Sequence, residues 1–190
     1  LVLVSGYLGW LIERISFSEI TVVKSIGLII LVFSLSSAIA YKSLRKSVKS
    51  IINSLNEFSS EKNIKDARKK LRNIVGRDVN HLSKKEILRA TAESASENSV
   101  DGIFAPIFWM FVGIILWKFS TNLPGPLALS WSFKASSTID SMLGYKKGNL
   151  FWIGYFGAKL DDFLTWVPCR LVLITLPLIS QGWYLAPKLI

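Results

Sequence analysis

The sequence predicts an all-α protein that lies in a membrane, with four to five transmembrane or membrane-embedded helices and one basic helical loop. Two observations lead to this prediction. Hydrophobic residues make up 51% of the chain although 19% of it is charged, and the two kinds are separated along the sequence. The segment 42–89 holds 14 of the 23 Lys and Arg residues but 5 of the 13 acids, a local balance of +9. We therefore expect one membrane domain over residues 1–190, with 42–89 as a basic insertion.

The apolar runs are the expected membrane helices. The stretch 1–12 is too short to cross a bilayer alone, and the chain begins with Leu, so we expect truncation at one or both ends. The run 20–41, ITVVKSIGLIILVFSLSSAIAY, is long enough for a ~30 Å hydrocarbon core. Several of the seven Trp residues stand at the ends of apolar runs, as in an aromatic belt. The alternative is a soluble core of short helices, which so many apolar runs disfavour. The further predicted spans are 103–119, 126–143 and 171–186.

The basic insertion is expected in the cytoplasm, because it follows a spanning helix and is short enough for the positive-inside rule. Within it, EKNIKDARKKLRNIV at 61–75 places Ile64, Ala67, Leu71 and Ile74 at helical spacing, with basic residues on the other side. This helix either packs on its neighbours with a solvated outer face, or it contacts anionic lipid headgroups or phosphates. The pattern is not specific for nucleic acid.

A helix start is marked by LSKKEI. Ser83 is the expected N-cap, Glu86 completes a capping box, and Leu82 can pack onto Ile87. We expect the helix to continue through AESASENSVDG at 92–102.

This helix should carry an acidic stripe. Residues four apart share a face, so Glu93, Glu97 and Asp101 line up, with Asn98 beside them. Pro106 is expected to bend or restart the helix. Three carboxylates in succession repel one another, and something positive must offset the repulsion.

Two interpretations of the stripe remain open. Arg89, Lys134 or Arg170 could neutralise the acids as salt bridges. A magnesium site is the functional interpretation, because Mg²⁺ prefers hard oxygen ligands and often shares carboxylates with phosphate groups. The single cysteine, Cys169, excludes an internal disulfide and a cysteine-rich zinc site. Neither common nucleotide-binding fingerprint is present in the sequence.

Alternation of the spans brings further acids to the cytoplasmic side. If 103–119 runs outward, then 126–143 returns, and Asp140 ends in the cytoplasm. The segment 150–166 is mixed in character and is expected to form an interfacial helix that carries Asp161 and Asp162. Arg170 would then open the last outward span. Three acidic clusters are therefore predicted at one membrane face.

Four motifs stand in a characteristic order: GRDVNHL at 76–82, AESASENSVDGIFAPIFW at 92–109, KASSTIDSMLGYK at 134–146 and GAKLDDFLTWVPCRL at 157–171. Taken together, they resemble the cobinamide-phosphate synthase family of cobalamin biosynthesis, the CobD/CbiB type, over about residues 5–175. Ser137 and Thr165 stand where the family usually has Asn, which puts fine substrate contacts in doubt.

The resemblance implies a multi-pass cell-membrane enzyme whose active site faces the cytoplasm. It would join aminopropanol phosphate to the free carboxyl of adenosylcobyric acid through an amide bond, driven by ATP with Mg²⁺. The expected partners are this corrinoid, the amine, ATP and membrane lipid, with no nucleic acid. Whether the amine is phosphorylated and whether the protein forms a homo-oligomer stay open.

The resemblance also implies residue roles. It assigns catalysis to six acids: Glu93, Glu97, Asp101, Asp140, Asp161 and Asp162. The first three of these, Glu93, Glu97 and Asp101, are the expected metal ligands. Substrate or nucleotide binding is assigned to Arg77, Asp78, Asn98, Lys134, Thr138, Tyr145, Lys146 and Arg170. Which acid acts as the base stays open.

Two alternatives to an enzyme are a non-catalytic membrane protein and a cation transporter. A non-catalytic, AmpE-like membrane relative is disfavoured because all six acids are retained. In a cation transporter the acids should lie at mid-depth, whereas the alternation of spans puts them near one edge.

Overall fold

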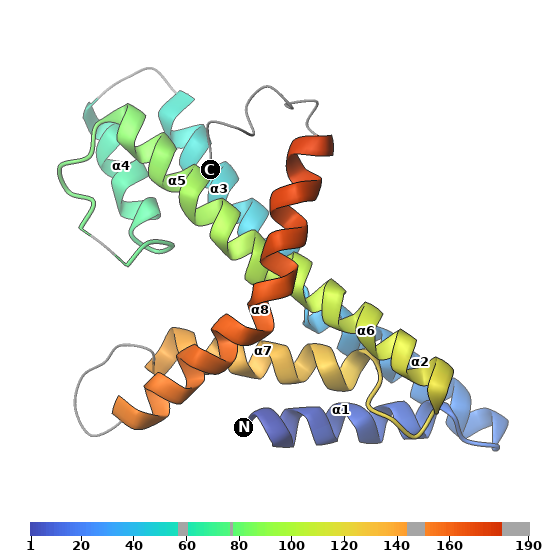
Figure 1. Ribbon diagram of the computed structural model, residues 1–190. Coiled ribbons are helices and arrows are strands. Elements are labelled where there is room, and N and C mark those ends of the chain that lie inside the picture. Colours follow the sequence, from blue (N-terminus) through green and yellow to red (C-terminus); the bar gives the residue numbers. More distant parts are fainter. Residues whose placement is uncertain (57–60, 77, 144–150, 180–190) are drawn as a thin grey trace. The chain divides into compact units, whose positions relative to one another are not determined.

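The computed structural model describes the chain in four stretches, and every element in them is helical (Figure 1). This confirms the all-α prediction. The chain divides into two compact units, residues 1–39 with 100–190 and residues 40–99, called here the first and the second unit. The described stretches are residues 1–56, 61–76, 78–143 and 151–179.

The second unit is built from three helices and encloses the predicted basic insertion 42–89. Its helices are α3 (Tyr41–Asn56), α4 (Glu61–Leu71) and α5 (Lys84–Ser99). The apolar residues of the segment 61–75 face the core as their spacing predicted. Ala67 and Leu71 on α4 are fully buried, and Ile64 on α4 and Ile74 after it pack against the core. The buried core consists of Ile51, Leu55, Ala67, Leu71, Val79, Ile87 and Ala90.

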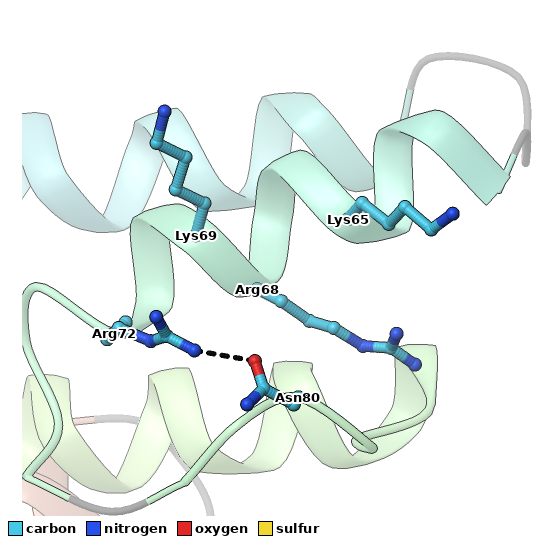
Figure 2. Close-up of a pocket in the computed structure, with 5 residues that line it drawn as sticks. All are labelled: Lys65, Arg68, Lys69, Arg72 and Asn80. Carbon is cyan, nitrogen blue, oxygen red and sulfur yellow. Dashed lines mark hydrogen bonds between the residues drawn. The ribbon is translucent and has the colours of Figure 1, made fainter.

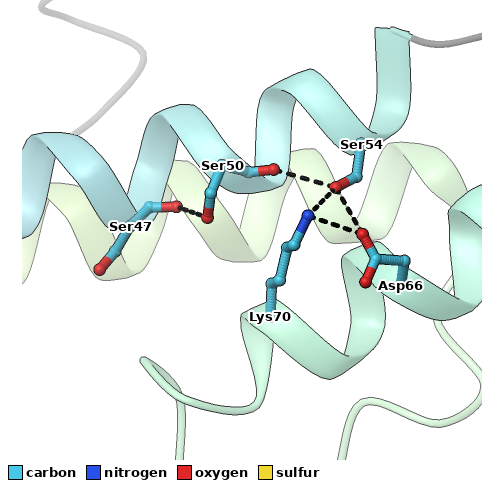
Figure 3. A network of polar contacts seen from close by, with 5 residues as sticks. All are labelled: Ser47, Ser50, Ser54, Asp66 and Lys70. Carbon is cyan, nitrogen blue, oxygen red and sulfur yellow. Dashed lines mark hydrogen bonds and ion pairs between the residues drawn. The ribbon is translucent and has the colours of Figure 1, made fainter.

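A polar cluster joins α3 to α4 (Figure 3). The ammonium of Lys70 lies 2.6 Å from Asp66 Oδ2 and donates to Ser54 Oγ at 2.7 Å. Ser54 Oγ also lies 2.9 Å from Asp66 Oδ2. The bonds from Lys70 and Ser54 lower the pKa of Asp66 below its ordinary value. The face of α4 that carries Asp66 and Lys70 is therefore turned toward α3.

The capping box at the start of α5 is confirmed. Ser83 donates from its backbone N–H and its hydroxyl to Glu86 Oε2, both at 2.7 Å, and the Glu86 N–H lies 3.4 Å from Ser83 Oγ. Leu82 packs against the core cluster that contains Ile87, as expected for the hydrophobic contact beside such a box.

Ser83→Ala should lower the free energy of unfolding by about 1 kcal/mol, because the Glu86 N–H loses its side-chain acceptor. Chemical denaturation of the purified protein, followed by helical circular dichroism, measures this loss. Ser96→Ala, an exposed serine within the same helix, is the control and should leave the midpoint nearly unchanged. An unchanged midpoint in Ser83→Ala would contradict the capping role.

The α-helix restarts next to Pro106, which stands in the first turn of the helix that follows. Between α5 and α6 (Ala105–Phe119) lies a π-helical turn, η1 (Val100–Phe104), so the backbone stays helical through the proline. A proline inside an α-helix removes one hydrogen bond and crowds the carbonyl four residues before it. A wider π-turn, which often replaces an α-turn at functional sites, accommodates this crowding. Asp101 lies in η1, so the acidic stripe is α-helical only as far as Glu97.

The first unit is centred on α7, which contacts all four of its other α-helices. Gly9 on α1 allows the backbones of α1 and α7 to approach closely, because a Cβ there would lie 2.8 Å from the Ala128 Cα. Small residues at such a crossing let two backbones pack tightly. The remaining helices of this unit are α1 (Val2–Ser16), α2 (Thr21–Ser37), α7 (Pro126–Leu143) and α8 (Phe151–Ile179).

A buried carboxylate caps α7. The side chain of Glu13 is fully buried and accepts the N–H groups of Gly125 at 2.8 Å, Leu127 at 2.6 Å and Ala128 at 3.1 Å. Pro126 has no N–H to satisfy, so one carboxylate serves the donors on both sides of it. Burial raises the pKa of Glu13, and the three N–H donors counteract that rise. The negative charge also faces the positive end of the helix dipole.

Two helical segments of the described chain are long and apolar enough to cross a membrane. They lie in Thr21–Leu55 and Lys84–Phe119 and correspond to the predicted spans 20–41 and 103–119. Only 17% and 22% of their apolar windows are buried within the structure, unlike the core helix of a soluble protein. Helix α7 has the predicted bounds but is not among these candidates.

The described parts of the predicted interfacial helix, 151–166, and of the last predicted span, 171–179, lie in one helix, α8, where the sequence predicted two separate segments. Pro168 is buried in the interior of this helix, and its missing N–H leaves the carbonyl of Leu164 without its helical donor. Trp109 on α6 supplies one instead, since its Nε1 lies 3.2 Å from Leu164 O. The helix changes direction along its length (Figure 1), as expected of a proline-containing helix.

Candidate functional site

Four of the six predicted acids lie in the first unit, on three elements of which one contacts the other two. Asp101 lies in η1, Asp140 in the last turn of α7, and Asp161 and Asp162 in the middle of α8. Helix α8 contacts both α7 and η1.

Gly157 explains how α8 comes close to α7 near these acids. A Cβ at this position would lie 2.6 Å from Ile139 Cγ2 and 3.8 Å from the Asp140 backbone nitrogen. Gly157 precedes Asp161 by four residues, so both lie on the same side of α8. The glycine therefore brings the face of α8 that carries Asp161 toward the end of α7 that carries Asp140.

Asp161 is the carboxyl group that this arrangement perturbs most clearly. The pKa of Asp161 is raised from 3.8 to about 7. Burial is the largest cause, the charges of Asp101, Asp140 and Asp162 also raise the pKa, and Lys134 lowers it. Asp161 lies outside the two candidate membrane spans. The structure therefore brings Asp101, Asp140, Asp161 and Asp162 within electrostatic reach of one another, and we call these four the aspartate group.

Buried polar atoms beside Asp161 lack hydrogen-bond partners. In the part of the chain that the structure describes, Asp161 Oδ1 and Thr165 Oγ1 are both buried without one. They stand four residues apart, on one face of α8. Ser136 Oγ on α7 is also buried without a partner. Such atoms are rare in folded proteins and call for an explanation such as a ligand or an ion.

The raised pKa of Asp161 predicts a pH-dependent stability. The folded protein holds a proton on this carboxyl between about pH 4 and pH 7, where the unfolded chain has lost it, so the free energy of unfolding should fall as the pH rises through this window. Asp161→Asn should remove this part of the slope. Thermal unfolding in detergent at pH 5, 6, 7 and 8 measures it, with Glu19→Gln, an exposed acid, as the control. Equal slopes in wild type and Asp161→Asn would contradict the prediction.

Three predicted binding residues lie on the helices that carry the aspartate group. Lys134 acts on Asp161 as the opposing charge. Thr138 is exposed and donates to Lys134 O at 2.7 Å, a bond within its own helix. The guanidinium of Arg170 lies 3.8 Å from the ring centre of Trp166 and donates to Trp166 O at 3.1 Å. Arg170 is thus held by its own helix.

The remaining predicted acids lie in the second unit. Glu93 and Glu97 are exposed on α5. Asn98 beside them donates from Nδ2 to Ser94 O at 2.8 Å and lies 3.2 Å from Ser94 Oγ, and Ser94 Oγ in turn donates to Ile74 O at 2.7 Å. Of the three predicted metal ligands, Glu93 and Glu97 therefore lie in the second unit and Asp101 in the first, and the metal site stays a prediction. Within the described stretches, no group of three or more His, Cys, Asp or Glu side chains is arranged to hold a metal ion.

The GRDVNHL motif forms a connection before α5. Asp78 accepts the backbone N–H of Asn80 at 3.0 Å, a local turn of the kind that Asp commonly makes. Three further predicted binding residues, Arg77, Tyr145 and Lys146, lie outside the described residues.

Sequence reasoning missed one residue that positions this region. Glu13 fixes the first turn of α7, the helix that carries Lys134 and Asp140. An acid directly after the apolar stretch 1–12 was the available signal, since a carboxylate next to a membrane-like segment needs donors. Its partners could not be read from the sequence, because they lie 112 to 115 residues away.

Comparison with known proteins gives one consistent result. The family profile described as CobD/Cbib protein matches residues 1–188. The cobalamin biosynthesis protein CobD of Synechocystis is 39% identical over 96% of this chain and 51% of its own length. The protein of the same name from Clostridium acetobutylicum is 37% identical over 95% of this chain and 52% of its own length.

The chain thus spans about half the length of these curated relatives. No solved structure matches it. A family profile that covers nearly all of the chain confirms the resemblance read from the four motifs. The chain belongs to the CobD/CbiB family of cobalamin biosynthesis proteins.

Proposed function

We propose that the protein is an adenosylcobinamide-phosphate synthase, which joins aminopropanol phosphate to the free carboxyl of adenosylcobyric acid at the expense of ATP. The observation that carries this proposal is the aspartate group around Asp161, with its perturbed carboxyl and its unsatisfied buried oxygen. Strongly perturbed carboxyls with specific charged neighbours are typical of active sites. Family membership supplies the corrinoid context.

The proposed reaction has two stages, because a carboxylate is a poor electrophile. First, a carboxylate oxygen of the corrinoid attacks the γ-phosphorus of ATP, which gives an acyl phosphate and ADP. Then the amine attacks the acyl carbon, the carbon–oxygen bond to phosphate breaks, and the amide and inorganic phosphate are formed. The proton that the amine loses must go to a base.

The residues of the first unit suit the second stage. An amine arrives mainly as an ammonium ion, which the aspartate group would attract and orient. A carboxyl with a pKa of about 7 is matched to proton transfer near neutral pH, so Asp161 is our candidate for the base. Lys134, which already opposes the charge of Asp161, would neutralise phosphate oxygens.

The aspartate group also fits a magnesium ion that arrives with ATP. Such an ion uses one or two carboxylates together with phosphate oxygens and water, so a set of three protein ligands is not required. The unsatisfied Asp161 Oδ1 is a hard donor whose charge needs a cation. The ion would neutralise the phosphate charge during transfer. Glu93 and Glu97, which lie in the second unit, stay proposed metal ligands.

The proposed setting is the cell membrane, with several spans and the active site on the cytoplasmic side. The two long apolar segments and the net charge of +10 support this orientation, since basic residues concentrate in the second unit. ATP is available on that side.

The direct test supplies purified protein with adenosylcobyric acid, aminopropanol phosphate, ATP and Mg²⁺ and follows the corrinoid by mass spectrometry. We expect a mass gain equal to aminopropanol phosphate less one water, and one ADP for each product. Omission of ATP should prevent the gain. A folded sample that gives no product would defeat the proposal and would favour a non-catalytic membrane relative. Free aminopropanol in place of its phosphate shows which amine is used.

A further inference from the structure

The second unit contains a basic pocket that the proposed reaction does not use (Figure 2). It has a volume of about 350 Å³ and is open on one side. Lys65, Arg68 and Lys69 line it from α4, Arg72 lines it from the turn directly after α4, and Asn80 lines it from the loop of the GRDVNHL motif. The lining thus carries four positive charges and no carboxylate.

Four neighbouring positive charges destabilise the protein when no anion is bound. Lys65, Arg68 and Lys69 stand at i, i+3 and i+4 on one face of α4, and like charges at these spacings destabilise a helix. Arg72 follows directly after the helix, and its backbone N–H donates to Arg68 O at 3.0 Å. The acids of α4 do little to offset them, since Asp66 pairs with Lys70 outside the pocket and Glu61 lies 3.8 Å from Lys65 in a pair that is almost fully exposed. An anion in the pocket would relieve the repulsion.

Three side chains of the pocket are held in place. Arg68 donates from Nε to Leu82 O at 2.9 Å, which fixes its side chain and leaves its two terminal nitrogens outside this bond. Arg72 donates from Nη2 to Asn80 Oδ1 at 2.5 Å, and the Asx turn from Asp78 fixes the Asn80 backbone. Figure 2 shows Arg72 and Asn80 pointing toward one another, while Lys65 and Lys69 extend outward from α4.

We propose that this pocket binds a phosphate group. Two positioned guanidinium groups match the oxygens of a phosphate in a bidentate way, and two mobile ammonium groups add charge that can close over it. The volume lies at the lower end of the range for ligand pockets, which suits a phosphate with a small attached body. The phosphate comes either from a soluble polyphosphate or phosphomonoester or from an anionic lipid headgroup, because both present the same oxygens.

The test has two arms on the full chain in neutral detergent. In the first, calorimetry at constant ionic strength measures the affinity for tripolyphosphate. In the second, native mass spectrometry counts phosphatidylglycerol molecules retained after lipid addition. The test variant is Arg68→Gln with Arg72→Gln. The matched control is Lys42→Gln with Lys46→Gln, which removes two exposed charges from α3 in the same unit, outside the pocket.

The arginine variant should weaken binding at least tenfold in one or both arms, while the control stays within twofold of wild type. Loss in the first arm identifies a soluble phosphate, and loss in the second identifies a lipid headgroup. If the arginine variant loses helicity, Lys65→Gln with Lys69→Gln replaces it, since neither lysine takes part in the bonds that hold the loop. No binding by wild type, or equal losses in pocket and control variants, would overturn the proposal. The amide-forming assay is not a readout here, so the two proposals fail independently.

Discussion

Glu97→Gln is expected to reduce amide formation by about 10²–10³-fold, while the protein stays folded and inserted. Glu97 is exposed on α5, one turn after Glu93, so a neutral side chain of the same size costs little stability. Its proposed role is to hold the charge of magnesium and ATP, and loss of one such electrostatic contact commonly costs this much in rate. The corrinoid mass assay measures the effect at saturating ATP and Mg²⁺.

Glu61→Gln is the matched control for this variant. Glu61 is an exposed acid of the same unit and lies 3.8 Å from Lys65, in a pair too exposed to matter for stability. Its substitution should leave turnover within twofold of wild type. If Glu97→Gln keeps wild-type turnover, Glu97 does not belong to the site. If both variants lose activity equally, net charge rather than position is responsible.

Glu13→Leu is expected to be the most destabilising single substitution in the first unit, at about 4 kcal/mol. It leaves the N–H groups of Gly125, Leu127 and Ala128 buried without an acceptor, and each such group costs about 1–3 kcal/mol. For a chain of this size the melting temperature should fall by about 10 °C. Thermal unfolding in detergent measures the change.

Two further variants show whether the loss of stability comes from the lost cap or from replacing any acid in this region. Glu13→Gln keeps one acceptor oxygen but turns an NH₂ group toward a donor, so it should lose part of the stability. Glu19→Leu alters an exposed acid in the loop after α1 and should leave the melting temperature nearly unchanged. A Glu13→Leu protein that melts with wild type would show that water or another group satisfies the start of α7.

The cap also links the first unit's stability to its candidate site. Helix α7 begins at the cap and ends beside Asp140, so fraying of its first turn would disturb the helix that carries Lys134. We expect Glu13 variants to lose activity in proportion to the folded fraction. A Glu97 variant should lose activity with the folded fraction unchanged, so the two classes of residue are experimentally distinct.

The sequence by itself determined the features that depend on near neighbours. Apolar spacing identified the buried face of α4, and LSKKEI identified the start of α5, because a capping box joins residues three apart. Composition identified the basic segment and the two long apolar segments. The order of four motifs identified the family, which the profile match confirmed.

Only the tertiary structure decided the features that join distant parts of the chain. Glu13 finds donors more than a hundred residues away, and Trp109 finds the carbonyl that Pro168 leaves unpaired. The sequence showed six similar acids, whereas packing singled out Asp161, because desolvation and the fields of neighbouring charges depend on where the helices meet. The local sequence pattern determines which residues share a helix face, but the tertiary packing of the helices determines which residues that face contacts.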